Sequence, residues 1–301
     1  MTGRRSWGPR LERGAERGAQ RRVRPEPAGR AGRDAFVRAL GRCHRWFVLT
    51  GAGCSTGSGI PDYRDESGGW KRPEPMHLSR FLGSEQARRR YWARSLLGWP
   101  VFSAARPGRA HRALRELERG GRVRALVTQN VDGLHSRAGS HGVIDLHGRN
   151  DRVLCTGCGA AMARDRFQGE LVHRNPRFAH LEATPAPDGD ADLGEVDFNR
   201  FEVPACPQCG GVVRPDVVFF GDAVPRARVE AALEALRGAD MLLAVGTSLM
   251  VYSGYRFCRE AEEREIPIFI LNRGRTRADP IARGKLEADC GAVLEDIARA
   301  L

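Results

Sequence analysis

The feature that most restricts the fold of this chain is the regular alternation of short apolar stretches with amphipathic ones from residue 34 onward. The apolar stretches lack the polar–apolar alternation of a half-exposed strand, so they are typical of strands buried on both faces. They cover residues 46–50, 124–128, 143–146, 241–246 and 266–271. Strands of this kind, separated by amphipathic helices, predict an α/β fold with a doubly wound, Rossmann-like parallel sheet.

Helix boundaries support this pattern. Asp34 can cap a helix that places Phe36, Val37 and Leu40 on one face. The pair Gly120-Gly121 should end a second helix, whose apolar face is Ala110, Ala113, Leu114 and Leu117. A third helix should begin after Pro225 and end at Gly238.

The length of 301 residues allows two domains, or one large lobe with an insertion. Residues 66–104 and 151–213 interrupt the alternation, and we assign both to a smaller lobe. The large lobe then comprises residues 34–65, 105–150 and 214–301. Within the smaller lobe, residues 184–195 are rich in Pro, Gly and Asp and predict a surface loop.

The positive charge is concentrated at the N-terminus. Residues 1–33 hold ten Arg and three Glu, a net charge of +7, out of +12 for the whole chain. This segment has little apolar surface, so we expect a disordered Arg-rich tail. It lacks the apolar stretch of a secretory signal, and no apolar run reaches the roughly 18 residues that a membrane span needs. We therefore expect a cytoplasmic protein without a membrane contact.

Two Cys-x-x-Cys pairs, Cys155/Cys158 and Cys206/Cys209, are the most specific local signal among the eight cysteines. A two-residue spacer lets both thiolates of a pair face one ion, and two pairs complete a tetrahedral zinc site. With all four positions supplied by protein, such a zinc is structural. Redox-active pairs and chance spacing are the alternatives.

A glycine-rich segment, residues 51–64 (GAGCSTGSGIPDYR), follows the first predicted strand. Its glycines, Gly51, Gly53, Gly57 and Gly59, would let backbone amides approach a phosphate pair at a helix start. The spacing differs from the dehydrogenase fingerprint, and no acidic residue marks the end of a second strand about 20 residues later. A glycine-rich turn without a ligand is the alternative.

Polar side chains also follow two later strands. Gln129, Asn130 and Asp132 follow one strand, and His147 ends another. Because carboxyl ends of strands in such a sheet border the ligand crevice, these groups could reach a ligand, and His147 could act as a base near neutral pH. A polar turn and a structural histidine are the alternatives.

Taken together, these motifs resemble the sirtuin family of NAD-dependent protein deacylases. The resemblance covers residues 34–301 and rests on GAGCSTGSGIPDYR, TQNVDGLH, DLHG, the cysteine pairs, RPDVVFFGD, GTS, LNRG and Cys290. RYWARSLLGWP, NDRVLC, the PDGD loop and VYSGYRF resemble in particular class II sirtuins, the group of the fourth mammalian sirtuin, which is mitochondrial. Because almost all positive charge is Arg, we expect a bacterial member; a mitochondrial location would apply only to a eukaryotic one.

The resemblance implies NAD as co-substrate and assigns its contacts residue by residue. The implied NAD-binding residues are Gly51, Ala52, Gly53, Ser55, Ile60, Asp62, Tyr63, Arg64, Gln129, Asn130, Val131, Asp132, Gly246, Thr247, Ser248, Asn272, Arg273, Gly274 and Cys290. Cys54 departs from the family, which usually has an aliphatic residue there. It is interpreted as a small buried hydrophobe, with a reactive thiol as the alternative.

The resemblance further implies His147 as general base, assisted by Asn130 and Asp132, and a substrate peptide paired as an added strand with Val218, Phe219, Phe220 and Gly221. In the family mechanism the acyl-lysine oxygen displaces nicotinamide at the ribose C1′, and the base then activates a ribose hydroxyl. Lysine, nicotinamide and O-acyl-ADP-ribose are the products.

Acyl preference is predicted from one pair in the smaller lobe. Tyr91 and Arg94 are three residues apart in a helical stretch and can share a face. A similar Tyr-x-x-Arg pair holds the acyl carboxylate in desuccinylating sirtuins. This predicts a preference for acyl groups with a terminal carboxylate, with a solvated Arg94 as the alternative.

Two other functions are consistent with parts of the pattern. Protein mono-ADP-ribosyl transfer breaks the same nicotinamide bond, so no motif separates it from deacylation. A non-enzymatic zinc module that binds nucleic acid would need Arg clustered with aromatic residues near the cysteines. Residues 151–213 instead contain ten Asp or Glu and six Arg, so bases are not in excess there. We therefore expect acylated-lysine proteins and NAD as partners, no nucleic acid, and a monomer.

Overall fold

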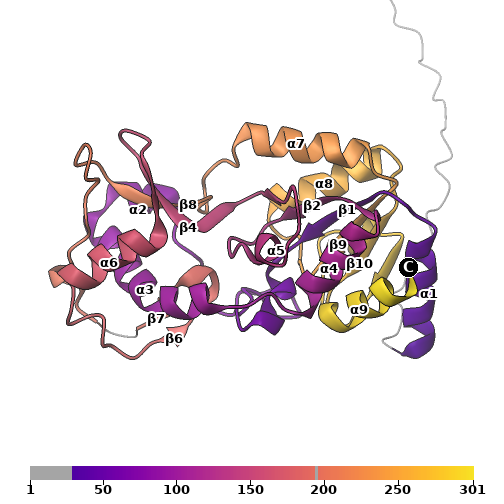
Figure 1. Cartoon of the computed structure of the whole chain (residues 1–301), viewed down its shortest axis with the longest axis horizontal. Coiled ribbons are helices and arrows are strands. Elements are labelled where there is room, and N and C mark those ends of the chain that lie inside the picture. Colours follow the sequence, from indigo (N-terminus) through magenta and orange to yellow (C-terminus); the bar gives the residue numbers. More distant parts are fainter. Residues whose placement is uncertain (1–28, 194–195) are drawn as a thin grey trace, which may run out of the picture.

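The larger part of the molecule is built on a six-stranded parallel sheet, in a computed structural model that describes residues 29–193 and 196–301. Strands and helices occupy the right-hand part of Figure 1, with α1 and α9 at its outer end. The strands are β1 (Trp46–Thr50), β2 (Val123–Thr128), β3 (Ile144–Asp145), β9 (Met241–Val245), β10 (Ile268–Leu271) and β11 (Gly284–Leu286). The predicted parallel sheet is confirmed.

The order of the strands fixes where a ligand can bind. The sheet runs β11-β10-β9-β1-β2-β3, so β1 pairs in parallel with β2 on one side and with β9 on the other. The chain leaves β1 toward one edge and later returns to build the other edge from β9. This reversal opens a crevice beyond the carboxyl ends of β1 and β9, where ligands bind in doubly wound sheets.

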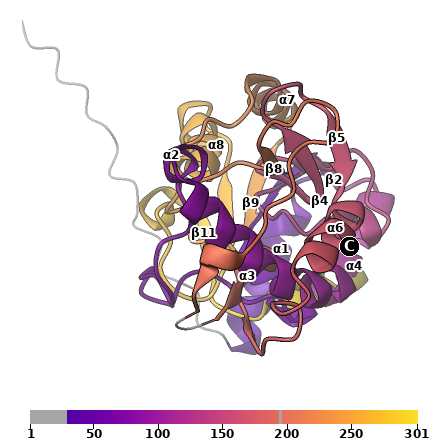
Figure 2. The same ribbon diagram turned by 90° about the vertical axis from the view of Figure 1, so that its left-hand side faces the viewer.

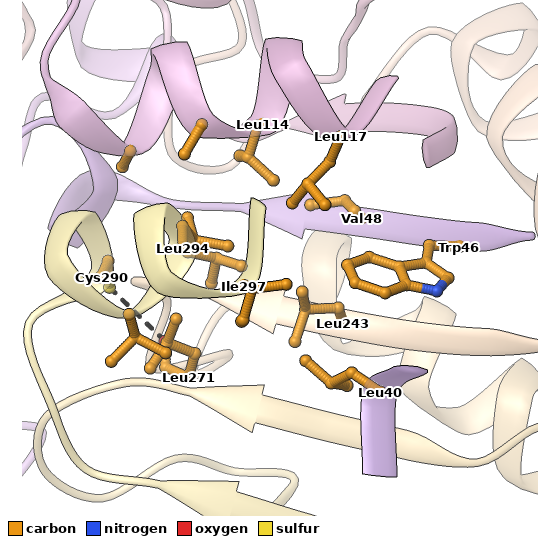
Figure 3. Packing of buried hydrophobic residues seen from close by; sticks show 14 of the residues in the cluster. Leu40, Trp46, Val48, Leu114, Leu117, Leu243, Leu271, Cys290, Leu294 and Ile297 are labelled. Atoms are coloured by element: carbon orange, nitrogen blue, oxygen red, sulfur yellow. Dashed lines mark hydrogen bonds between the residues drawn. The ribbon is translucent and has the colours of Figure 1, made fainter. Parts of the chain in front are cut away.

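Two apolar layers cover the sheet because successive side chains of β1 point to opposite faces. Trp46 and Val48 pack with helices α1 (Arg30–Gly41), α4 (Arg109–Arg119) and α9 (Cys290–Ala300), and Figure 3 shows this layer. Phe47 and Leu49 pack with α7 (Arg226–Arg237) and α8 (Tyr252–Glu263) on the other face. The sheet is therefore buried on both faces, as its apolar strands predict.

The smaller lobe contains helices and a separate antiparallel sheet, and Figure 2 views the molecule from its side. Strand β4 lies between the other two strands of this sheet. The elements are α2 (Leu78–Gly83), α3 (Glu85–Ala104), β4 (Gly148–Cys155), β5 (Ala161–Ala163), α6 (Arg164–Arg174) and β8 (Val213–Val217). The expected lobe borders at residues 150 and 214 fall inside strands. Strand β4 begins before residue 150 and β8 continues beyond residue 214, and the two strands pair with each other across these borders.

Residues 184–193, the described part of the predicted surface loop 184–195, instead form a short hairpin packed on α3. Strands β6 (Thr184–Pro185) and β7 (Ala191–Asp192) pair around the turn η3 (Pro187–Gly189). This hairpin packs on α3 at Gly98, where an added Cβ would lie 2.3 Å from the carbonyl oxygen of Gly189. Ala186 and Ala191 are buried as a result.

The predicted start of the first helix is also wrong. Helix α1 begins at Arg30, after an N-cap at Gly29, and Asp34 lies inside it. Its early turn is held by an ion pair between Arg33 and Asp296 of α9, with an N–O distance of 2.7 Å. Residues 30–33 therefore belong to the folded domain, and residues 1–28 of the expected tail lie outside the described residues.

The helices of the described residues include none that combines the length and the apolar character of a membrane span.

Candidate active site and metal centre

A cavity of about 540 Å³ lies beyond the carboxyl ends of β1, β2 and β9. Its walls come from the segments that follow these strands, from the segment after β8, and from the start of α8. Seventeen of the nineteen implied NAD-binding residues line it, together with His147 and the four implied peptide-binding residues. Those seventeen are Gly51, Ala52, Gly53, Ser55, Ile60, Asp62, Tyr63, Arg64, Gln129, Asn130, Val131, Asp132, Gly246, Thr247, Ser248, Asn272 and Arg273.

Two glycines let the segments after β1 and β9 meet at the cavity floor. An added Cβ on Gly51 would lie 2.6 Å from Cβ of Thr247, and one on Gly246 would lie 2.4 Å from the amide nitrogen of Cys54. Gly246 also has a φ of 59°, a left-handed value that favours glycine. The helix start predicted for the glycine-rich segment after β1 is absent. The segment instead forms two 3₁₀ turns, η1 (Ala52–Cys54) and η2 (Thr56–Ser58).

A hydrogen-bonded network joins the polar residues after β2 to the glycine-rich segment. The side-chain Nδ2 of Asn130 donates to the carbonyl oxygen of Gly51 and to Oγ of Ser55, both at 3.0 Å. The Ser55 hydroxyl donates to Asp132 at 2.7 Å. Nε2 of Gln129 donates to Oγ1 of Thr247 at 2.9 Å. The amide and carboxylate groups are thus held in fixed orientations at the cavity.

The imidazole of His147 is oriented from both sides. Nδ1 lies 2.9 Å from the carbonyl oxygen of Gln129, which can only accept, so Nδ1 carries the proton of the neutral ring. Nε2 is then the acceptor, and it lies 2.8 Å from Oγ of Ser253. Burial lowers the pKa of His147 to about 4, and the nearby guanidinium groups of Arg228 and Arg256 act in the same direction. A neutral base therefore faces the cavity at neutral pH.

Ser253 and Arg256 line the cavity and were not recognised as site residues from the sequence. They belong to the first turns of α8, within the VYSGYRF segment that carried part of the family resemblance. Their spacing of three residues places them on one helix face, which was the available signal.

The segment after β8 forms the wall opposite α8. The amide of Val218 donates to the carbonyl oxygen of His147 at 2.8 Å, which ties this wall to the base. The carbonyl oxygen of Phe220 accepts from the amide of Leu78 at 2.9 Å. Phe219 is buried and packs against the ring of Phe81, with centroids 5.0 Å apart.

Two implied NAD-binding residues are not among those that line the cavity. The carbonyl oxygen of Gly274 accepts from Nζ of Lys285 at 2.8 Å. Cys290 is buried at the start of α9, where its Sγ lies 3.6 Å from the carbonyl oxygen of Leu271 (Figure 3).

Tyr91 and Arg94 do not form the predicted acyl pocket, because neither lines the cavity. The ring of Tyr91 packs against Phe81 and Phe219, with centroids 5.3 and 5.5 Å away, and burial raises the pKa of its hydroxyl. Arg94 forms a two-pronged ion pair with Asp190, with N–O distances of 2.9 and 2.8 Å. The guanidinium that we predicted to bind an acyl carboxylate is thus paired with a carboxylate of the hairpin on α3.

Cys54 is buried next to two imidazoles, those of His111 and His135. It belongs to the apolar cluster under β1 and is 3% exposed, which supports the interpretation as a small buried hydrophobe, and the same burial raises the pKa of its thiol. Nδ1 of His111 accepts from the amide of Gly108 at 3.1 Å, so the proton of the neutral ring is on Nε2. That proton makes this group a poor metal site despite its ligand types.

The four cysteines of the two pairs converge at one point of the smaller lobe. Their Sγ atoms all lie within 4.8 Å of one another. Sγ of Cys155 lies 3.4 Å from that of Cys209, and Sγ of Cys158 lies 3.7 Å from that of Cys206. Tetrahedral Zn–S bonds of about 2.3 Å place sulfurs about 3.8 Å apart. The four thiols therefore fit one structural zinc ion.

Comparisons with known proteins agree on one protein family. Residues 51–253 match the model of the Sir2 family. The chain is 58% identical over 253 residues to the NAD-dependent protein deacetylase of Xanthomonas campestris pv. campestris (strain 8004), covering 84% of this chain and 86% of that protein.

Two solved structures resemble the fold at lower identity. The crystal structure of a Sir2 homolog–NAD complex matches with a TM-score of 0.67 and 29% identity, covering 89% of this chain and 93% of that one. A Sir2–p53 peptide–NAD⁺ complex matches with a TM-score of 0.66 and 28% identity, covering 88% and 95%.

Proposed function

The chain belongs to the Sir2 family, and on that premise we propose that it is an NAD-dependent protein-lysine deacylase. It converts an acyl-lysine and NAD to lysine, nicotinamide and O-acyl-ADP-ribose. The observation that carries this proposal is the convergence of His147 with Gln129, Asn130 and Asp132 at one cavity, from segments that follow different strands.

The groups at the cavity suit a dinucleotide. Three guanidinium groups, of Arg64, Arg273 and Arg275, line it and can balance the charge of a pyrophosphate. The hydroxyls of Thr247 and Ser248 can bind phosphate or ribose oxygens. We propose the seventeen lining residues named above as the NAD contacts, with Gly274 and Cys290 in supporting positions.

When bound, NAD supplies a nicotinamide–ribose bond whose cleavage leaves an ADP-ribosyl acceptor for the acyl group. His147 is proposed as the base, because it lines the cavity and its neutral ring has the acceptor lone pair on Nε2, where Ser253 now donates. Asn130 and Asp132 orient the groups next to it through the Ser55 network. Val218, Phe219, Phe220 and Gly221 are proposed to bind the backbone of the substrate peptide.

The remaining assignments follow from the same premise. The four cysteines are proposed to hold one structural zinc, which contributes to folding of the smaller lobe. We propose a cytoplasmic monomer that acts on acylated proteins, without nucleic acid or membrane as partner. Protein mono-ADP-ribosyl transfer is the second candidate, because it would use the same cavity and base.

A panel of acyl-lysine peptides, incubated with and without NAD and separated by liquid chromatography, tests the proposal. We expect NAD-dependent conversion of the acetyl-lysine peptide, because the named relative is a deacetylase. Modification of a protein by ADP-ribose, with no peptide deacylated, would favour the second candidate instead.

A further inference from the structure

Arg256 brings a positive charge to the cavity that none of the acidic residues lining it neutralises. It lies one turn after the Ser253 that contacts His147, on the same face of α8. Its Nε is buried and has no hydrogen-bond partner among the described residues, and no ion pair is found for its guanidinium there. The other arginine of this helix, Arg259, pairs with Glu262 and Glu263 at 3.5 and 3.6 Å.

Among the described residues, no acidic group of the cavity forms an ion pair with Arg256; two are paired with other cations and two are hydrogen-bonded to serine hydroxyls. Four aspartates line the cavity, and each one has a partner in the structure. Asp62 pairs with Lys71 at 2.5 Å, Asp65 with Ser67 at 2.6 Å, Asp132 with Ser55 at 2.7 Å and Asp222 with Arg214 at 2.9 Å. In the described part of the chain no carboxylate is paired with Arg256, so its charge is available to an anionic group of a ligand.

The position of Arg256 separates it from the cations suited to a pyrophosphate. Arg64, Arg273 and Arg275 come from loops after β1 and β10, whereas Arg256 comes from α8 beside the proposed base. Its guanidinium carbon lies 5.3 Å from the ring centre of Tyr252. Tyr252 and Val251 line the cavity and are 57% and 38% exposed, so the cavity is open to solvent beside Arg256.

The helix holds Arg256 in place. Gly254 packs so closely on Gln129 that an added Cβ would lie 2.4 Å from Oε1 of Gln129. Ser253 is fixed by its contact with His147. The first turn of α8 is therefore anchored on both sides, and Arg256 projects from a rigid element, which favours selective binding.

We propose that Arg256 forms a carboxylate-binding subsite that selects acyl-lysine substrates with an acidic residue beside the modified lysine. This inference rests on the proposed deacylase function and adds a substrate class to it. A guanidinium binds a carboxylate through two parallel N–H···O bonds. The two terminal Nη groups of Arg256 can supply both, because Nε is buried and no hydrogen bond to a described residue is found for either Nη. The carboxylate could also be the end of an acyl group, so the test separates the two sources.

The test compares four peptides as substrates of the full-length protein. An acetyl-lysine peptide carries either Glu or Gln at a flanking position, scanned along both sides of the lysine. A third peptide carries glutaryl-lysine and a fourth its neutral amide, both with Gln flanks. Peptide affinity is measured by calorimetry alongside kcat/KM, so that binding is seen even without turnover.

The wild type should prefer the Glu peptide over the Gln peptide by about tenfold in kcat/KM, which corresponds to ~1.4 kcal/mol. Arg256→Met should remove this preference and Arg256→Lys should keep part of it. Arg259→Met is the matched control, because its charge is paired on the same helix, and it should leave the preference unchanged.

Absence of the preference in the wild type, or its persistence in Arg256→Met, would overturn the proposal. If Arg256→Met changes only the ratio between the glutaryl peptide and its amide, the carboxylate belongs to the acyl group. That result would reject the class of substrates with an acidic flanking residue. If no peptide is deacylated by any variant, the proposed function fails, and the calorimetric Glu-to-Gln ratio still decides the role of Arg256.

Discussion

The hydroxyl oxygen of Ser253 lies 2.8 Å from Nε2 of His147. Since Nδ1 of this ring donates to the carbonyl oxygen of Gln129, the serine hydroxyl donates to the lone pair that the base must use. Ser253 therefore stabilises the neutral ring and must turn away before Nε2 can accept a proton from substrate. The contact links 147 and 253, positions that no local sequence pattern connects.

Substituting Ser253 by Ala should change the pH profile more than the affinity for NAD. Loss of a hydrogen bond to the neutral ring raises the pKa of His147, so the acid-side decline of kcat/KM should move to higher pH. Ser253→Thr keeps the hydroxyl and serves as control. An unshifted profile for Ser253→Ala would show that the hydroxyl does not act on the base.

The wild-type pH profile should itself report the environment of His147. Its pKa is lowered to about 4, so the ring stays neutral as pH falls below the ordinary value near 6.5 and is protonated only near 4. We expect kcat/KM to be retained between pH 6.5 and 5 in initial-rate measurements. A decline of kcat/KM centred near pH 6.5 would contradict the lowered pKa of the buried His147 ring.

Replacing His147 by Ala should preserve NAD binding and lower deacylation by about 10²–10⁴-fold, the usual contribution of a general base. Binding is measured by calorimetry and turnover by chromatography of the peptide. His173→Ala, at an exposed position of α6, is the control. Product formation close to wild type would remove His147 from the proposed mechanism.

Elemental analysis should find one zinc per chain, and Cys206→Ser should lose the metal and become insoluble. A closed four-thiolate site contributes folding free energy directly, so losing one ligand destabilises the smaller lobe. Cys43→Ser is the control, because Cys43 lies outside the four-cysteine group. A soluble, active Cys206→Ser protein without zinc would refute the assignment.

Deletion of residues 1–28 should leave peptide deacylation unchanged, whereas deletion of residues 1–41 should destabilise the protein. The longer deletion removes Phe36 and Leu40, which are 3% and 0% exposed in the layer shown in Figure 3. Emptying one such large apolar site costs about 3–5 kcal/mol. Urea unfolding of both variants checks this, and equal stability of the two would contradict the packing of α1.

The sheet was predictable because its strands are apolar throughout. β1 has the bounds that the sequence predicts, and α7 begins after Pro225 and ends at Gly238 as expected. The start of α1 was missed because a tertiary ion pair, Arg33 with Asp296, extends the helix into an Arg-rich segment. Local signals describe an element well only where no distant residue changes its ends.

In the active site, too, local signals were sufficient for some residues and tertiary contacts decided others. Motifs placed the residues after β1, β2 and β9 at one cavity, because carboxyl ends of parallel strands share an edge. The interpretation of Arg94 failed although Tyr91 and Arg94 do share a helix, since Asp190 arrives from a hairpin far along the chain. The role proposed for Arg256 also depends on tertiary structure, because the sequence does not show that Arg259 has ion-pair partners and Arg256 has none among the described residues.

The most direct test of the central claim is the product balance of one reaction with acetyl-lysine peptide and NAD, measured by mass spectrometry. We expect deacetylated peptide, nicotinamide and O-acetyl-ADP-ribose in equal amounts from the wild type. His147→Ala should form deacetylated peptide and O-acetyl-ADP-ribose at no more than about 1% of the wild-type rate, because the base acts after nicotinamide has left. Nicotinamide release with ADP-ribose attached to protein, and no deacetylated peptide, would contradict the central claim.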